Sequence, residues 1–188
     1  MMRTHFDIET IVESGAITNE LDYERALIAD RKLRLLSKES LYFKELRSKL
    51  RGLIGKYEDI EWADVEKIDE QKLLDSDKAE RAAELERLFI ENRRQSIRKK
   101  LKELDLTQEN LASILGHKSK TYMSELMNGI KPFTLRDLII INWLLKIDFN
   151  ELVPVFLSEE DQTKVREAVE TLNKPKLKLS AEDLASFI

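Results

Sequence analysis

The side chains whose types and spacing could do chemistry gather in one short segment, residues 107–131. Amide, hydroxyl, ammonium and carboxylate groups follow one another there. These groups donate and accept hydrogen bonds, so the chemistry they suggest is reversible recognition of a polar surface rather than bond making. Ten of them are candidates for ligand contact: Gln108, Lys118, Ser119, Lys120, Thr121, Tyr122, Ser124, Glu125, Asn128 and Lys131.

The rest of the sequence does not supply the residues of an enzyme. With 0 Cys there is no thiolate nucleophile and no cysteine-ligated zinc, and the 2 His, His5 and His117, are too few for a histidine metal site. We expect His117 to be solvated or to face a phosphate. The acid pairs at 58–59 and 159–160 have no nucleophile or glycine loop beside them. We therefore expect no catalytic residue, no metal and no cofactor.

The candidate residues lie on two predicted helices joined by a sharp turn. Thr107 is a good N-cap for a helix over Gln108–Leu115, and Gly116 can adopt the left-handed conformation that ends it. Ser119 can cap the next helix, Lys120–Met127. The apolar positions expected between the two helices are Leu111, Ala112, Leu115, Met123, Leu126 and Met127. The pattern predicts a helix-turn-helix, in which the first helix supports and the second is presented outward.

A helix presented in this way can enter the major groove of DNA, because its N-terminal residues then reach the base edges. Lys120 could donate to guanine, and Thr121 could meet a thymine methyl group or hydrogen-bond a base edge. Glu125 could accept from cytosine N4, or it could be an ordinary exposed glutamate.

The segment resembles the Cro and lambda-repressor type of helix-turn-helix, also called XRE-like. The similar residues are Gln108, Ala112, Gly116, Met123, Leu126 and Asn128-Gly129, and the resemblance covers about Ile97 to Pro154, including Thr134 and Asp137 as a capping box. It implies that Gln108, Asn128 and Lys131 bind phosphates. In one departure, His117-Lys118 stand where the usual motif has one residue, which lengthens the turn and leaves the angle of the second helix open.

The N-terminal part is similar to the region that precedes the DNA-binding domain in HigA-like antitoxins of toxin-antitoxin pairs. The matching residues lie at Asp22-Tyr23, Ala26-Leu27 and Tyr57-Glu58. The resemblance implies that the N-terminal helices mediate dimerisation and toxin contact, with a toxin similar to RelE-type messenger-RNA interferases. An ordinary helical oligomerisation domain is the alternative.

The whole sequence favours the all-α class, because 5 Gly and 3 Pro in 188 residues are too few for the turns of a β-sandwich or barrel. Helical periodicity over 18–37 and 40–58 predicts an antiparallel hairpin, followed by an acidic linker over 59–75. Further helices are expected at 76–104, 135–145, 150–153 and 158–172. We divide the chain into an N-terminal dimerisation and partner-binding region (1–75), a helix-turn-helix domain (76–157) and a C-terminal helix and tail (158–188).

The net charge of -4 hides a basic segment. Residues 92–137 contain ten Lys and Arg against five Asp and Glu, which favours a polyanion partner, although solvated helix faces carry similar charge. No apolar run reaches the roughly 18 residues of a membrane span, and no signal peptide is evident, so we expect a cytoplasmic protein without a membrane partner.

These observations lead to one expected function and two alternatives. We expect a homodimeric, sequence-specific repressor that binds double-stranded operator DNA, an inverted repeat in its own promoter, and neutralises a RelE-like toxin. The first alternative is an XRE-family DNA-binding regulator with no toxin partner. The second is a protein-interaction module that kept the helical scaffold without binding DNA.

Overall fold

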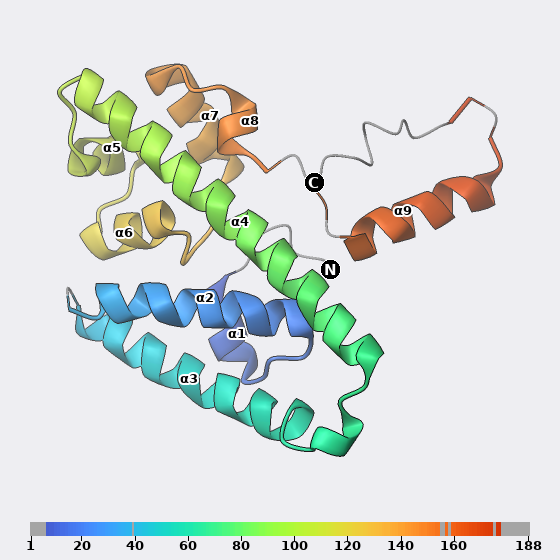
Figure 1. Ribbon diagram of the computed structural model, residues 1–188. Coiled ribbons are helices and arrows are strands. Elements are labelled where there is room, and N and C mark those ends of the chain that lie inside the picture. The colour runs from blue at the N-terminus through green and yellow to red at the C-terminus, as the bar shows by residue number, and fades with distance from the viewer. Residues whose placement is uncertain (1–6, 39, 155–156, 158, 175, 178–188) are drawn as a thin grey trace. The chain divides into compact units, whose positions relative to one another are not determined.

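The computed structural model describes residues 7–38, 40–154, 157, 159–174 and 176–177 (Figure 1). Within these ranges the chain forms nine α-helices, one short 3-10 helix and no strand, which confirms the expected all-α class. No helix in this described part is long and apolar enough to cross a membrane. The chain divides into two units, residues 1–152 and 153–188, and each is described by itself.

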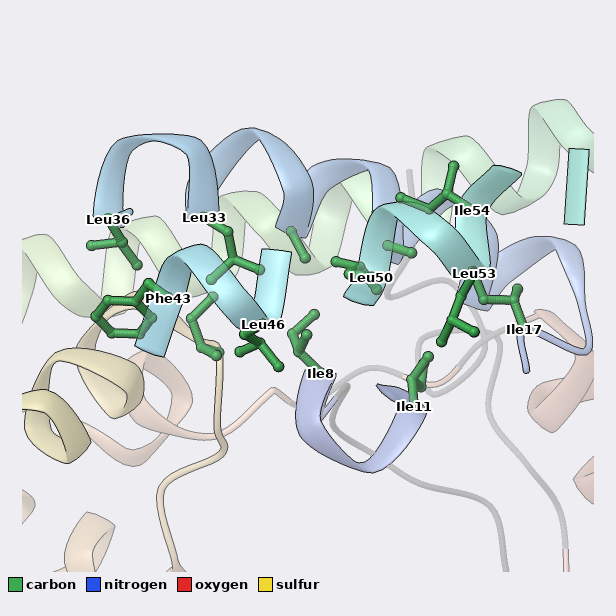
Figure 2. Packing of buried hydrophobic residues seen from close by; sticks show 13 residues of the cluster. Ile8, Ile11, Ile17, Leu33, Leu36, Phe43, Leu46, Leu50, Leu53 and Ile54 are labelled. Atoms are coloured by element: carbon green, nitrogen blue, oxygen red, sulfur yellow. The ribbon is translucent and has the colours of Figure 1, made fainter. Parts of the chain in front are cut away.

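The first unit begins with three helices around one apolar core. Helices α2 (Glu20–Leu36) and α3 (Leu41–Glu61) form the expected antiparallel hairpin, and α1 (Ile8–Ser14) packs against α3 (Figure 1). The short α1 was not predicted; Asp7 caps it by accepting a hydrogen bond from the backbone of Thr10. Figure 2 shows how side chains from all three helices meet; the labelled residues are Ile8, Ile11, Ile17, Leu33, Leu36, Phe43, Leu46, Leu50, Leu53 and Ile54.

Helix α4 (Glu70–Glu103) is longer than the sequence pattern indicated. It was expected to begin after Asp75 or Ser76, but the carboxylate of Asp69 accepts from the backbone N–H of Lys72 at 2.7 Å and caps the helix there. The expected linker is correspondingly shorter and contains the 3-10 helix η1 (Val65–Lys67). The boundary placed between residues 75 and 76 therefore falls inside a continuous helix.

Helix α4 contacts both halves of the first unit. Its first half packs on α2, where the guanidinium of Arg25 pairs with Glu86 and Ala83 is buried. Its second half buries Ile97 and Leu101 and packs against α6, α7 and α8. The N-terminal hairpin and the basic segment thus share one supporting helix.

Four short helices complete the first unit: α5 (Gln108–Leu115), α6 (Lys120–Asn128), α7 (Leu135–Leu145) and α8 (Phe149–Leu152). The sequence predicted their bounds to within about a residue, because their caps are local. Thr107, Ser119 and Thr134 cap α5, α6 and α7 as expected. Trp143 on α7 is 67% exposed, so this aromatic residue is not part of the described core.

The second unit contains α9 (Glu159–Leu172), which ends at the predicted residue. The predicted start of this helix at residue 158 and residues 178–188 of the expected tail lie outside the described residues.

Candidate nucleic-acid interface

Helices α5 and α6 enclose an open groove of about 650 Å³. The turn that joins them, residues 116–119, begins with Gly116 at φ +85°, in the left-handed region that glycine favours. It ends with Ser119, whose hydroxyl accepts from the backbone N–H of Tyr122 at 3.2 Å. Five of the ten candidate residues line the groove: Gln108, Lys118, Ser119, Lys120 and Ser124.

Lys120 is the most exposed of the side chains at the start of α6. Its side chain is 80% exposed, and Nζ lies 2.6 Å from a carboxylate oxygen of Glu109 on α5. An exposed ion pair of this kind contributes at most about 1 kcal/mol, so a competing acceptor can displace Glu109. Lys120 is therefore held over the groove and remains available to a ligand.

The C-terminal end of α6 is stabilised by a contact between two candidates, Asn128 and Ser124. The amide of Asn128 donates to the backbone carbonyl of Ser124 at 2.8 Å and to its hydroxyl at 3.2 Å. Both side chains are partly exposed, as is that of Thr121. These bonds leave the amide oxygen of Asn128 as a further acceptor near the end of the helix.

Glu125 does not face the groove, and its burial contradicts both alternatives, the cytosine contact and the ordinary exposed glutamate. Its side chain is 3% exposed and points toward the N-terminal helices, where it lies beside the hydroxyl of Tyr42 and 3.4 Å from Nζ of Lys131. Burial raises the pKa of this carboxyl even though Lys131 and Tyr42 favour the ionised form. Glu125 therefore joins α6 to the rest of the fold.

Lys131 is likewise turned inward, contrary to the phosphate contact that was expected. Its Nζ lies 2.6 Å from Glu9, and 5.2 Å from the ring centroid of Tyr122. Glu9 also accepts a hydrogen bond from Tyr42. Burial opposes the charge on Lys131, but the bond to Glu9 and the charges of Glu125 and Glu9 outweigh it and raise its pKa. We call Glu9, Tyr42, Glu125 and Lys131 the Lys131 cluster.

His117 lines the groove at the lengthened turn, but its side chain is only 17% exposed. Its Nε2 lies 3.2 Å from a carboxylate oxygen of Asp137, which is 1% exposed at the start of α7. Its ring meets the edge of Tyr122, with centroids 4.9 Å apart. Tyr122 therefore packs between His117 and Lys131, away from the groove, and only Lys118 of the two turn residues is exposed.

Basic side chains flank the groove on the side of α4. Arg98, Lys99 and Lys102 are exposed on its last turns. Arg98 and Lys102 line a second hollow of about 510 Å³ that also reaches Gln108, so Gln108 lies between the two hollows. The two hollows together are lined by four basic side chains and two acidic ones, Glu109 and Asp105, and this positive balance suits a polyanion.

Within the residues that the structure describes, no three His, Asp or Glu side chains group as metal ligands do. Comparisons with protein-family models, with curated proteins and with solved structures give no match for this chain. Functional inference therefore depends on the geometry and charge of the groove.

Proposed function

We propose that α5 and α6 act as a helix-turn-helix that binds double-stranded DNA, as in the Cro and lambda-repressor type. One observation carries the proposal: the first turn of α6 is capped by Ser119 and begins with the exposed Lys120 and the partly exposed Thr121, beside a groove flanked by the basic end of α4. A helix that offers its N-terminal turn in this way fits the major groove.

The proposed contacts divide into two classes. We assign Lys120, Thr121 and Ser124 to the base edges, because they are exposed or partly exposed along α6. The proposed phosphate ligands are Gln108, Lys118, Ser119 and Asn128. Tyr122, Glu125 and Lys131 hold α6 from behind. Phosphate contacts set the register of the helix on the duplex, whereas base contacts distinguish sequences.

A dimer is part of the proposal. One recognition helix with three base-reading side chains covers few base pairs, which gives too little specificity for a single operator. Two copies related by a two-fold axis would read an inverted repeat with half-site centres about 10 base pairs apart, or a multiple of this. Such a protein at its own promoter would act as a repressor.

The antitoxin role is proposed for the end of the hairpin that lies away from its turn. Residues 58–80 contain ten Asp and Glu against three Lys, and Ile60, Val65 and Leu73 are exposed there by 76%, 76% and 51%. A toxin that cleaves messenger RNA must attract a polyanion, so its surface is basic and complementary to this acidic segment. Co-purification with the product of the adjacent gene would separate an antitoxin from a regulator without a toxin partner.

The DNA-binding proposal is tested by Lys120→Ala in a series of promoter duplexes with single base-pair changes. We expect binding to weaken by about 1–3 kcal/mol and preference to relax at one position in each half-site. Lys56→Ala removes another exposed charge, near the other end of the hairpin, and should leave the preference intact. If the base preference of Lys120→Ala were unchanged, Lys120 would not be one of the residues that contact base edges.

A further inference from the structure

A second basic segment lies in the hairpin, outside the groove described above. Residues 31–56 contain nine Lys and Arg against two acids, Glu39 and Glu45, a balance of +7 in a chain whose net charge is -4. Two of the nine are engaged: Arg47 pairs with Asp30 at 2.8 Å and Lys32 lies 4.0 Å from Glu91. The remaining charges are exposed.

Three of these exposed charges surround the turn between α2 and α3. We call Arg34, Lys38 and Lys44 the basic tip. No carboxylate in the described part of the chain forms an ion pair with any of the three. Neighbouring like charges that form no ion pair among the described residues repel one another, and a polyanion would relieve that repulsion.

The fold holds the basic tip close to the C-terminal end of α6. Tyr42, which lies between Lys38 and Lys44 in the chain, donates to Glu9, and Glu9 pairs with Lys131 just beyond α6. The backbone N–H of Ile8 also donates to the carbonyl of Ile130 at 3.3 Å. Figure 1 shows the turn of the hairpin at the same end of the first unit as α5 and α6. The tip and the recognition helix are thus parts of one packed body.

We propose that the basic tip binds the phosphate backbone of the duplex that α6 enters, beyond the contacts made by α6 itself. This inference rests on the proposed DNA binding and extends its footprint to the N-terminal hairpin. The Lys131 cluster then has a defined consequence: it fixes the position of the tip relative to α6, so both can meet one rigid duplex.

Charge also argues against the tip as the toxin contact. An RNA-cleaving partner must itself be basic, and the net positive charge of the tip would repel it. The hairpin therefore separates two partners along its length, with DNA at the basic tip and the toxin at the acidic segment 58–80.

The test compares two double variants of the full-length protein that change net charge equally. Lys38→Gln/Lys44→Gln alters the tip, and Lys56→Gln/Arg81→Gln alters exposed charges away from it. Binding to an unrelated duplex and to the duplex upstream of the gene is followed by fluorescence anisotropy over a salt series. Each lost phosphate contact lowers the slope of log affinity against log salt by about 0.9, so the tip variant should lose about 1.8 for each bound protomer, or about 3.6 for the proposed dimer, on both duplexes.

A gain-of-function variant guards against loss by misfolding. Glu45→Gln removes an exposed acid beside Lys44 and should strengthen binding to both duplexes, whereas a misfolded protein could not bind more tightly. The role of the tip would be overturned if the tip variant and its control had equal slopes of log affinity against log salt and if Glu45→Gln did not bind DNA more tightly. If Lys120→Ala still changes the base preference in that case, the proposed DNA binding stands without a contact from the basic tip.

Two other outcomes are decisive. A wild-type protein that binds neither duplex overturns both the proposed function and the role of the tip. Weaker binding of the tip variant to an RNA duplex, with DNA binding unchanged, would assign the tip to RNA and refute the present inference.

Discussion

Replacing Gly129 with Ala tests how tightly the end of α6 is packed against α4. Gly129 ends α6 at φ +69°, and an added Cβ would lie 2.6 Å from Cγ2 and 2.9 Å from Cδ1 of Ile90. Ile90 is β-branched, and its χ1 is restricted within a helix, so Cγ2 cannot rotate freely away. The substitution therefore introduces both backbone strain and a steric clash.

The expected cost follows from these two terms. An L-residue in the left-handed region costs about 1–2 kcal/mol, and overpacking a tight contact costs about 1–3 kcal/mol more. Gly129→Ala should therefore lower the free energy of unfolding by about 2–5 kcal/mol. Gly116→Ala is the matched control, because Gly116 has φ +85° but no atom within 4 Å of the added Cβ. Gly116→Ala should show only the cost of the left-handed backbone conformation.

Urea denaturation followed by circular dichroism measures both losses, provided that the slope with denaturant is unchanged. The double variant Gly129→Ala/Ile90→Ala lacks the clash. Its loss of unfolding free energy should therefore be smaller than the sum of the two single losses, by about the cost of the tight contact. Equal losses for Gly116→Ala and Gly129→Ala, together with additive behaviour in the double variant, would show that this reasoning about the contact is wrong.

Three further predictions concern charged side chains. Glu125→Gln should raise the free energy of unfolding at neutral pH, because burial raises the pKa of Glu125 and the folded state disfavours its ionised form. This gain in stability should vanish at a pH below 4.5, the ordinary pKa of a glutamate, and urea denaturation at the two pH values measures it. Arg93 is 3% exposed, lies over the rings of Phe89 and Phe133 and donates to the carbonyl of Leu152. Arg93→Ala should therefore lower the free energy of unfolding by about 2–5 kcal/mol, and Arg93→Met should lower it clearly less, as measured by thermal denaturation. Glu109→Gln should tighten DNA binding about twofold to fivefold in anisotropy titrations, because it frees Lys120 from an exposed ion pair.

The sequence predicted the elements whose signals are local. Thr107, Gly116 and Ser119 act on residues three or four positions away, so the bounds of α5 and the start of α6 could be predicted from them. The seven residues of α1 gave no clear periodicity, because a helix that short depends on tertiary packing. The start of α4 was missed because an acidic, weakly periodic stretch resembles a linker even when Asp69 caps it.

The candidate site was harder to predict, because residues distant in the chain determine which of its side chains face the groove. Glu125 and Lys131 belong to the right types for DNA contact, yet Glu9 and Tyr42 hold both of them inside the fold. His117 is held by Asp137, whose capping role was predicted without its contact to the turn. Spacing within one segment could not reveal these partners.

The continuity of α4 limits which changes in chain length the protein can tolerate. One residue inserted near its middle would turn the C-terminal half by about 100° and advance it by about 1.5 Å, so the face that now meets α6 and α7 would point elsewhere. An insertion of seven residues would nearly restore the angle but would separate the hairpin from α6 by about 10 Å along the axis. Relatives of this chain should therefore vary in length in the turns and the C-terminal unit, while the number of residues between Ala83 and Ile97 stays constant.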